Sequence, residues 1–211
     1  FANPFQSGRT LIYLITNSLF GKNPWAYRLP NILTHLLVVF VIYILIETLV
    51  SHHAAIITAT LVAVHPIMTE AVTWISGGGY SSYTLLCLLA LYLFIERHKH
   101  PSFYWLSLLS FLIGLEFSEK AIVLPGIMLV YILLFEDFKK TWKTTIPYFL
   151  LSFIWVIKFA GLIDSRSTTF RDEFSQPDQH INPLVRIFVS LTSYLSLIFW
   201  PDKLTLFHSE M

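Results

Sequence analysis

The polar segment from His65 to Tyr80 contains the side chains best placed to do chemistry in this sequence. It reads HPIMTEAVTWISGGGY, with long apolar runs on both sides. Glu70 could bind a divalent cation or act as a general base. It could also open a short helix over residues 69–75, where a carboxylate suits the N-terminal end of the helix dipole. Spacing alone slightly favours the helical role.

The three glycines at residues 77–79 are a second feature of this segment. They lack the preceding strand and the following Lys-Ser/Thr that a phosphate-binding loop requires. A flexible link into the helix that begins at Tyr80 is therefore the better interpretation.

Another charged group, Ser118-Glu119-Lys120, lies between two apolar runs. Three polar residues suffice for the turn of a helical hairpin, so a solvated turn is one interpretation. In the other, Lys120 contacts a phosphate and Glu119 a metal ion or a hydroxyl. Glu116 needs a partner, and Lys120 at i+4 fits. Arginines that could bind a phosphate are Arg166 and Arg171.

Two ionisable residues, His35 and Lys158, lie inside apolar runs. Such residues often mark a functional site in a membrane. Packing against a neighbouring helix explains His35 equally well, and Lys158 can snorkel or reach a carboxylate. Both would also suit the path of a transporter or flippase, which stays an alternative.

The composition places the chain in the membrane class. Of 211 residues, 55% are hydrophobic and 13% are charged, and the mean hydropathy is +0.64. Soluble domains carry about 25% charged residues, so a polar surface cannot cover this chain. A net charge of +1 gives no reason to expect a nucleic-acid partner, and the single Cys87 allows neither a disulfide framework nor a thiolate metal site.

The apolar runs predict one all-α domain over residues 1–211, a bundle of about seven membrane spans with short interfacial helices on its outer face. Residues 1–26 belong to an outer loop, in which an interfacial helix over 10–20 ends at Gly21-Lys22-Asn23-Pro24. Transmembrane helices occupy 27–163, an outer loop 164–183, and a last apolar segment and the start of a further loop 184–211. The predicted spans are Leu29–Val50, Ala54–Val64, Tyr80–Ile95, Phe103–Phe117, Ala121–Phe135, Ile146–Ile163 and Leu184–Trp200.

Whether residues 184–200 cross the membrane or lie on its outer face is open. Neither end looks like a natural terminus, so a longer protein is expected. Alternation of the spans puts the basic residues at 97–99 and 139–143 on one side, which is predicted to be cytoplasmic. The loop 65–79 and Lys120 then face outward; Arg166 and Arg171 count against this orientation.

Four segments in order resemble polytopic glycosyltransferases of the GT-C superfamily, most closely the transmembrane-and-tetratricopeptide O-mannosyltransferase-like proteins and their bacterial relatives. Residues 65–77 resemble H-P-x-x-T-E-A-V-x-W-I-S-G, and residues 8–35 resemble R-P-L … L-F-G-x-N-P-x-x-Y-H-L-x-N-x-x-x-H. Residues 118–125 are similar to K-E-x-A-x-x-L-P, and residues 182–204 to N-P-L … Y-L … P-x-x-L.

The resemblance implies a multi-pass protein of the bacterial inner membrane or an equivalent membrane, with its active site on the extracytoplasmic face. Such an enzyme transfers a sugar, with inversion, from a polyprenyl-phosphate donor to a protein or glycan acceptor, often with a divalent metal such as Mg or Mn. The implied site residues are His65, Glu70 and Glu119 toward the acceptor or metal, with Glu70 as the metal ligand, and Arg9, Lys120, Arg166 or Arg171 toward the lipid phosphate.

The chain departs from the family pattern at several positions. Ser118 occupies the family's Lys position, and Gly78-Gly79 replace a polar residue and the Asp that often follows it. The acidic motif that supplies the catalytic base would precede Arg9, and residues 1–7 contain no carboxylate. The base is therefore expected upstream of Phe1, and tetratricopeptide repeats beyond Met211. Without an upstream acidic pair, a non-catalytic membrane scaffold is the alternative.

Overall fold

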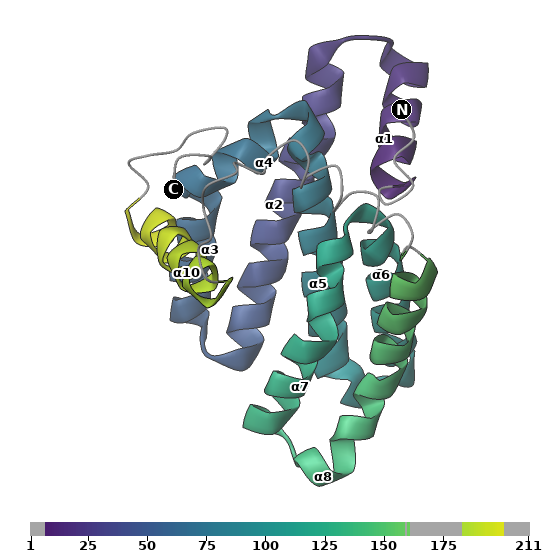
Figure 1. Ribbon diagram of the computed structural model, residues 1–211, viewed down its shortest axis with the longest axis vertical. Coiled ribbons are helices and arrows are strands. Elements are labelled where there is room, and N and C mark those ends of the chain that lie inside the picture. The colour runs from purple at the N-terminus through teal and green to yellow at the C-terminus, as the bar shows by residue number, and fades with distance from the viewer. Residues whose placement is uncertain (1–6, 159, 161–182, 201–211) are drawn as a thin grey trace.

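A computed structural model describes residues 7–158, 160 and 183–200 of the chain. Over these residues the protein is all-helical, as predicted (Figure 1). The elements are α1 Ser7–Phe20, α2 Pro24–Leu49, α3 His52–Val64, η2 Pro66–Met68, α4 Thr69–Thr73, η3 Ile75–Gly77, α5 Gly78–Ile95, η4 Glu96–His98, α6 Pro101–Phe117, η5 Glu119–Val123, α7 Leu124–Phe135, α8 Phe138–Thr141, η6 Trp142–Thr145, a helix over 146–158, and α10 Pro183–Phe199.

The turn between α1 and α2 lies at residues 21–23, where the sequence predicted the end of the first helix. Gly21 follows α1 with φ +59°, a conformation that costs glycine little because it has no Cβ. The Asn23 side chain then accepts a hydrogen bond from the Trp25 amide at 3.1 Å and caps α2. As a result α2 begins at Pro24, before the predicted start of the span, and Pro30 lies inside the helix.

His65 and Pro66 break the third apolar segment. The backbone of His65 is extended (φ −67°, ψ 126°), as expected for a residue that precedes proline. The helices before and after this break, His52–Val64 and Pro66–Thr73, are inclined at 53° to each other.

Helix α5 is the central element of the bundle. It packs against α2 and α6, and α3 packs against the other side of α2. The buried core joins α5 and α6 to α7 and the helix over 146–158; its largest buried members are Phe94, Phe111, Leu115, Met128, Ile132 and Tyr148. Two buried hydroxyls in this core are paired: the Tyr148 hydroxyl donates to Ser107 at 2.7 Å, and Ser107 donates to the Ala90 carbonyl at 2.6 Å.

A buried ion pair closes the end of the bundle that holds α8, which we call the α8 end (Figure 1). Arg97 contacts Glu136 at 2.6 Å, with side chains only 5% and 12% exposed. The Arg97 guanidinium also lies 4.0 Å from the centre of the Phe94 ring. The loops after α5 and α7 therefore lie at one end, as predicted; which membrane side this end faces stays a prediction.

The prediction of about seven spans is wrong for the described residues. Two helices, Pro24–Leu49 and Gly78–His98, are long and apolar enough to cross a membrane, and the bent pair His52–Val64 and Pro66–Thr73 makes three if it is one span. The other predicted spans are shorter because the backbone leaves the helix: Ser118 is extended (φ −160°, ψ 138°), and α7 does not begin until Leu124. With 12 residues, α7 is about 18 Å long, against a hydrocarbon core of about 30 Å.

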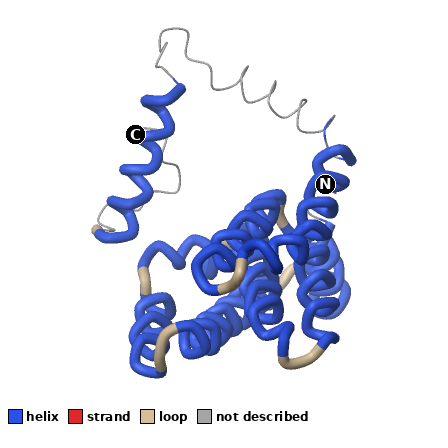
Figure 2. The backbone as a smooth tube through the Cα atoms, turned by 90° about the horizontal axis from the view of Figure 1, so that it is seen from below, coloured by secondary structure: helices blue, strands red, loops and turns tan. Residues whose placement is uncertain are grey.

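Helix α10 stands outside the bundle formed by the other helices (Figure 2). It covers the predicted last apolar run, and many of its large apolar side chains are exposed, among them Ile187, Phe188 and Tyr194. It meets the α3 segment through His65, whose Nε2 donates to the Ile198 carbonyl at 2.9 Å. The Ile67 amide donates to Nδ1 of the same ring, so Nδ1 is the acceptor and Nε2 carries the proton.

Candidate functional site

The end of the bundle opposite α8, which we call the α1 end, brings together α1, the start of α5 and the turn after α6 (Figure 1). The approach of α1 to α6 is close. A Cβ atom on Gly8 would lie 2.7 Å from the Phe117 ring, so only glycine fits here without a shift. The Ser7 hydroxyl beside it donates to the Glu116 carboxylate.

The segment that leads into α5 is packed against α2 through Asn31. This side chain is 4% exposed, and its amide donates to the carbonyls of Trp74 at 3.0 Å and Ile75 at 3.4 Å. A Cβ atom on Gly78 would lie only 1.9 Å from the Asn31 Oδ1. A Cβ atom on Gly77 would lie 2.7 Å from the Glu70 carbonyl oxygen.

The interpretation of the three glycines as a flexible link is therefore wrong. Gly77 closes η3, Gly78 and Gly79 form the first turn of α5, and all three are buried. Gly77 and Gly78 are needed because the Glu70 backbone and the Asn31 side chain occupy the space of a side chain, whereas a Cβ atom on Gly79 would make only ordinary contacts. The role of Gly77 and Gly78 is close packing.

Tyr13 holds the same segment from the α1 side. Its hydroxyl donates to the Ile75 carbonyl at 2.7 Å. Burial raises the pKa of this hydroxyl, and the nearby Arg9 charge offsets part of the rise. The phenol therefore stays protonated at neutral pH and keeps its donor.

Arg9 and Lys120 approach the first turn of α5 from different elements. The Arg9 Cδ lies 3.5 Å from where a Cβ atom on Gly79 would be, and the Arg9 guanidinium lies 6.0 Å from the centre of the Tyr13 ring. The Lys120 Nζ lies 4.5 Å from the centre of the Tyr80 ring, within the range of a cation–π contact. Both cations are thus next to the N-terminal, positive end of the α5 dipole.

The turn after α6 differs from the predicted i+4 pair of Glu116 and Lys120. Because the helix ends at Phe117 and Ser118 is extended, the two side chains no longer share a helix face. Glu116 is bonded to Ser7 instead, and Lys120 lies over Tyr80. The buried Ser118 side chain accepts from the Lys120 amide at 3.3 Å and starts η5, in which Glu119 is half-buried.

Of the predicted site residues, Arg9, Glu119 and Lys120 lie in this cluster. Glu70 adjoins it only by its backbone at Gly77; it lies in the first turn of α4 with an exposed side chain, as the helical interpretation predicts. His65 is half-buried and bonded to α10, as described above. Arg166 and Arg171 lie outside the described residues.

Metal binding by Glu70 stays a prediction. Among residues 7–158, 160 and 183–200, no three His, Cys, Asp or Glu side chains lie close enough together to hold a metal ion. Glu70 and Glu119 are carboxylates of the type that Mg²⁺ or Mn²⁺ prefers.

Sequence reasoning missed the residues that position this cluster. Asn31 and Tyr13 hold the backbone before α5, and Ser7 fixes α1 to α6. Asn31 stands at the Asn of the N-x-x-x-H pattern, so the motif marked it without indicating its role. No sequence signal pointed to Tyr13, because its partner is a backbone carbonyl far along the chain.

The fold and this cluster define a helical membrane protein with two cations, Arg9 and Lys120, beside one helix N-terminus. Residues 10–163 match the family described as dolichyl-phosphate-mannose-protein mannosyltransferase, and the chain belongs to this family. The family resemblance seen in the sequence motifs is thereby confirmed at the level of a mannosyltransferase family.

Two curated relatives share part of the chain. It is 33% identical over 138 residues to the human protein O-mannosyl-transferase TMTC1, covering 57% of this chain and 15% of that protein. It is 32% identical over 130 residues to the mouse protein of the same name, covering 54% and 14%. The chain thus spans about one seventh of their length. No solved structure matches it significantly.

Proposed function

We propose that this chain is the central membrane part of an inverting glycosyltransferase. It takes mannose or a related sugar from a dolichyl- or polyprenyl-phosphate donor and passes it to a protein or glycan acceptor on the extracytoplasmic face. The observation that carries the proposal is the convergence of Arg9 and Lys120 on the first turn of α5.

The chemistry of the transfer explains why these cations matter. When the sugar leaves, negative charge develops on the lipid phosphate, and fixed cations lower the energy of that transition state. A guanidinium can form two parallel hydrogen bonds to phosphate oxygens, and an ammonium adds a point charge. In the proposed site Arg9 and Lys120 hold the phosphate, and the positive end of the α5 dipole adds to their field.

The carboxylates have a separate role in the proposal. Glu119 adjoins the phosphate side through Lys120, while Glu70 is exposed at the start of α4. Both could contact the acceptor or hold a divalent metal, and His65 would line the acceptor side. We assign no catalytic base to these residues.

Mannosyl transfer by the intact protein from dolichyl phosphate mannose to an acceptor peptide tests the phosphate site. We expect Arg9→Ala and Lys120→Ala each to lower kcat/KM about 100- to 1,000-fold, in line with the loss of one group that stabilises developing charge. Arg9→Lys should recover part of the activity. The control is Lys22→Ala, an exposed lysine in the turn between α1 and α2. Equal activity of Lys120→Ala and Lys22→Ala would refute the site.

The carboxylates need their own test. Wild-type activity in a protein carrying both Glu70→Ala and Glu119→Ala would remove them from the mechanism. Donor binding without any transfer by the intact wild-type protein would favour a non-catalytic scaffold, and donor movement across vesicles without transfer would favour a flippase.

A further inference from the structure

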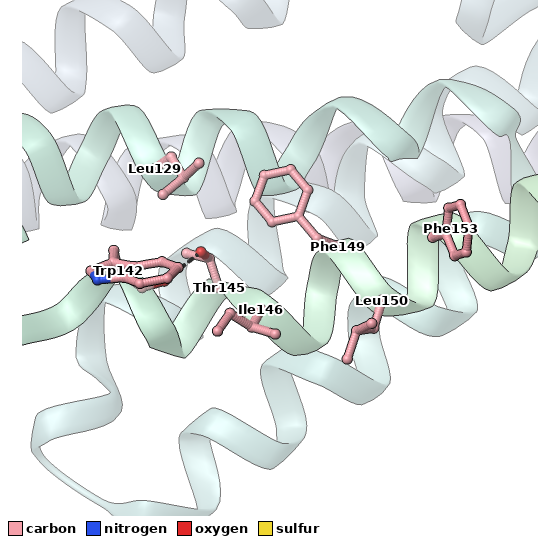
Figure 3. A pocket seen from close by; sticks show the side chains of 7 residues that line it. All are labelled: Leu129, Trp142, Thr145, Ile146, Phe149, Leu150 and Phe153. Atoms are coloured by element: carbon pink, nitrogen blue, oxygen red, sulfur yellow. Dashed lines mark hydrogen bonds between the residues drawn. The ribbon is translucent and has the colours of Figure 1, made fainter.

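An apolar groove lies between α7 and the helix over 146–158, at the end of the bundle opposite the proposed donor site. Its volume is about 450 Å³, within the ~300–1,000 Å³ typical of small-molecule sites. It is lined by Leu129, Trp142, Thr145, Ile146, Phe149, Leu150 and Phe153. Figure 3 shows Trp142 at one end of the groove and Phe153 at the other.

The walls of the groove suit a hydrocarbon chain. Six of its seven lining residues are aliphatic or aromatic, and the hydroxyl of the seventh, Thr145, is already bonded to the Trp142 carbonyl at 2.7 Å. Phe153 and Leu150 are 62% and 54% exposed, so the groove is open along its length. Apart from the Trp142 indole N–H at one end (Figure 3), the lining side chains offer no polar group that would orient a polar ligand.

The charges at the Trp142 end of the groove decide which lipid would fit. Most charged side chains here are paired with one another: Arg97 and His98 with Glu136, Lys99 with Glu96, and Lys140 with Asp137.

Lys139 and Lys143 form no ion pair within the described part of the chain, and both are exposed. Lys139 lies in α8, three residues before Trp142. Lys143 lies in η6 and directly follows Trp142. Tryptophan is enriched where hydrocarbon meets the headgroups. Two exposed cations without an ion pair among the described residues therefore flank the Trp142 end of an open apolar groove.

We propose that this groove binds an anionic phospholipid. One acyl chain lies along Phe149, Leu150 and Phe153, and Lys139 and Lys143 hold the headgroup phosphate. Basic pockets between membrane helices at the cytoplasmic side recognise anionic headgroups in this way. The site is separate from the proposed donor site, because α5 runs between the two ends of the bundle.

Native mass spectrometry of the intact protein in detergent tests the proposal, with phosphatidylglycerol and phosphatidylcholine of equal chain length as probes. Each lysine near an anionic headgroup contributes about a fivefold gain in affinity. We therefore expect wild-type protein to prefer phosphatidylglycerol about 30-fold, and the double change Lys139→Gln and Lys143→Gln to abolish that preference while phosphatidylcholine binding stays the same.

A variant that fills the groove, Leu129→Trp, should weaken binding of both lipids. Lys22→Gln, which removes one lysine at the other end of the bundle, should change neither. Equal binding of the two lipids by wild-type protein, or a preference that survives in the double lysine variant, would overturn the proposal. So would displacement of phosphatidylglycerol by millimolar inorganic phosphate, which would indicate a phosphate site without a lipid, or by dolichyl phosphate, which would indicate a donor site.

Discussion

The contact between Gly78 and Asn31 gives the sharpest test of how the site is held. The change is Gly78→Ala. Its φ of −59° is helical, so alanine fits the backbone, and by helix propensity alone it would stabilise the protein by up to about 1 kcal/mol. Packing predicts the opposite. The new Cβ would lie 1.9 Å from Oδ1, 2.7 Å from Cγ and 3.2 Å from Nδ2 of Asn31, all at or below a tight contact.

The Asn31 side chain must therefore rotate away and lose both hydrogen bonds to the segment before α5. The two carbonyls keep other partners, since Trp74 still accepts from the Gly77 amide at 2.9 Å and Ile75 from Tyr13 at 2.7 Å. The main loss is that of the buried Asn31 amide, about 1 kcal/mol for each of its hydrogen bonds and more if the amide stays unpaired. The net destabilisation expected is about 1–2 kcal/mol.

Thermal unfolding of the intact protein in detergent, followed by tryptophan fluorescence, measures this change. The matched control is Gly126→Ala in α7, where a Cβ atom would meet nothing within 4 Å and the propensity gain should appear unopposed. In an Asn31→Ala background the clash is absent, so Gly78→Ala should no longer destabilise. If Gly78→Ala and Gly126→Ala behave alike in the wild-type background, the reasoning is wrong.

Two further changes test the hydrogen bond and the ion pair that hold the two ends of the bundle. Tyr13→Phe removes the donor to the Ile75 carbonyl and should lower the free energy of unfolding by about 0.5–1.5 kcal/mol in the same thermal assay; no change would mean that the bond contributes nothing. Glu136→Gln leaves Arg97 buried without its carboxylate and should cost about 3–5 kcal/mol, whereas Asp137→Asn, in an exposed pair, should cost less than about 1 kcal/mol. Equal losses of unfolding free energy in these two variants would show that burial does not make the Arg97–Glu136 pair more stabilising than an exposed pair.

The fold was only partly predictable. Helix ends set by local chemistry were predicted well: the stop at Gly21 and the break at His65-Pro66 follow from glycine and proline geometry. Span number was predicted badly. Apolar runs show where hydrocarbon contact is possible, but a single extended residue such as Ser118 divides them, and its conformation depends on a side-chain bond to the Lys120 amide.

The site was predictable as a set of residue types and not as an arrangement. Arg9, Glu119 and Lys120 were marked by charge in an apolar chain. Their proximity in space could not be predicted, because it depends on the packing of α1 against the end of α6, and these two helices are far apart in the sequence. A match to a motif does not place a side chain. Glu70 matches the Glu of the family pattern, but the structure puts its side chain in solvent at the start of α4.

The sequence by itself determined that this is a helical membrane protein of a mannosyltransferase family, because composition and the order of motifs can be read without knowing which residues are in contact. Only the tertiary structure decided why residues 77 and 78 are glycine. Local chemistry allows a flexible link at three glycines, but Asn31 lies at 1.9 Å from a Cβ atom on Gly78 and belongs to a helix more than forty residues earlier. A side chain at Gly78 is excluded by a residue that is distant in sequence, so only the packed chain reveals the reason. Gly78 lies in the first turn of α5, which Arg9 and Lys120 approach.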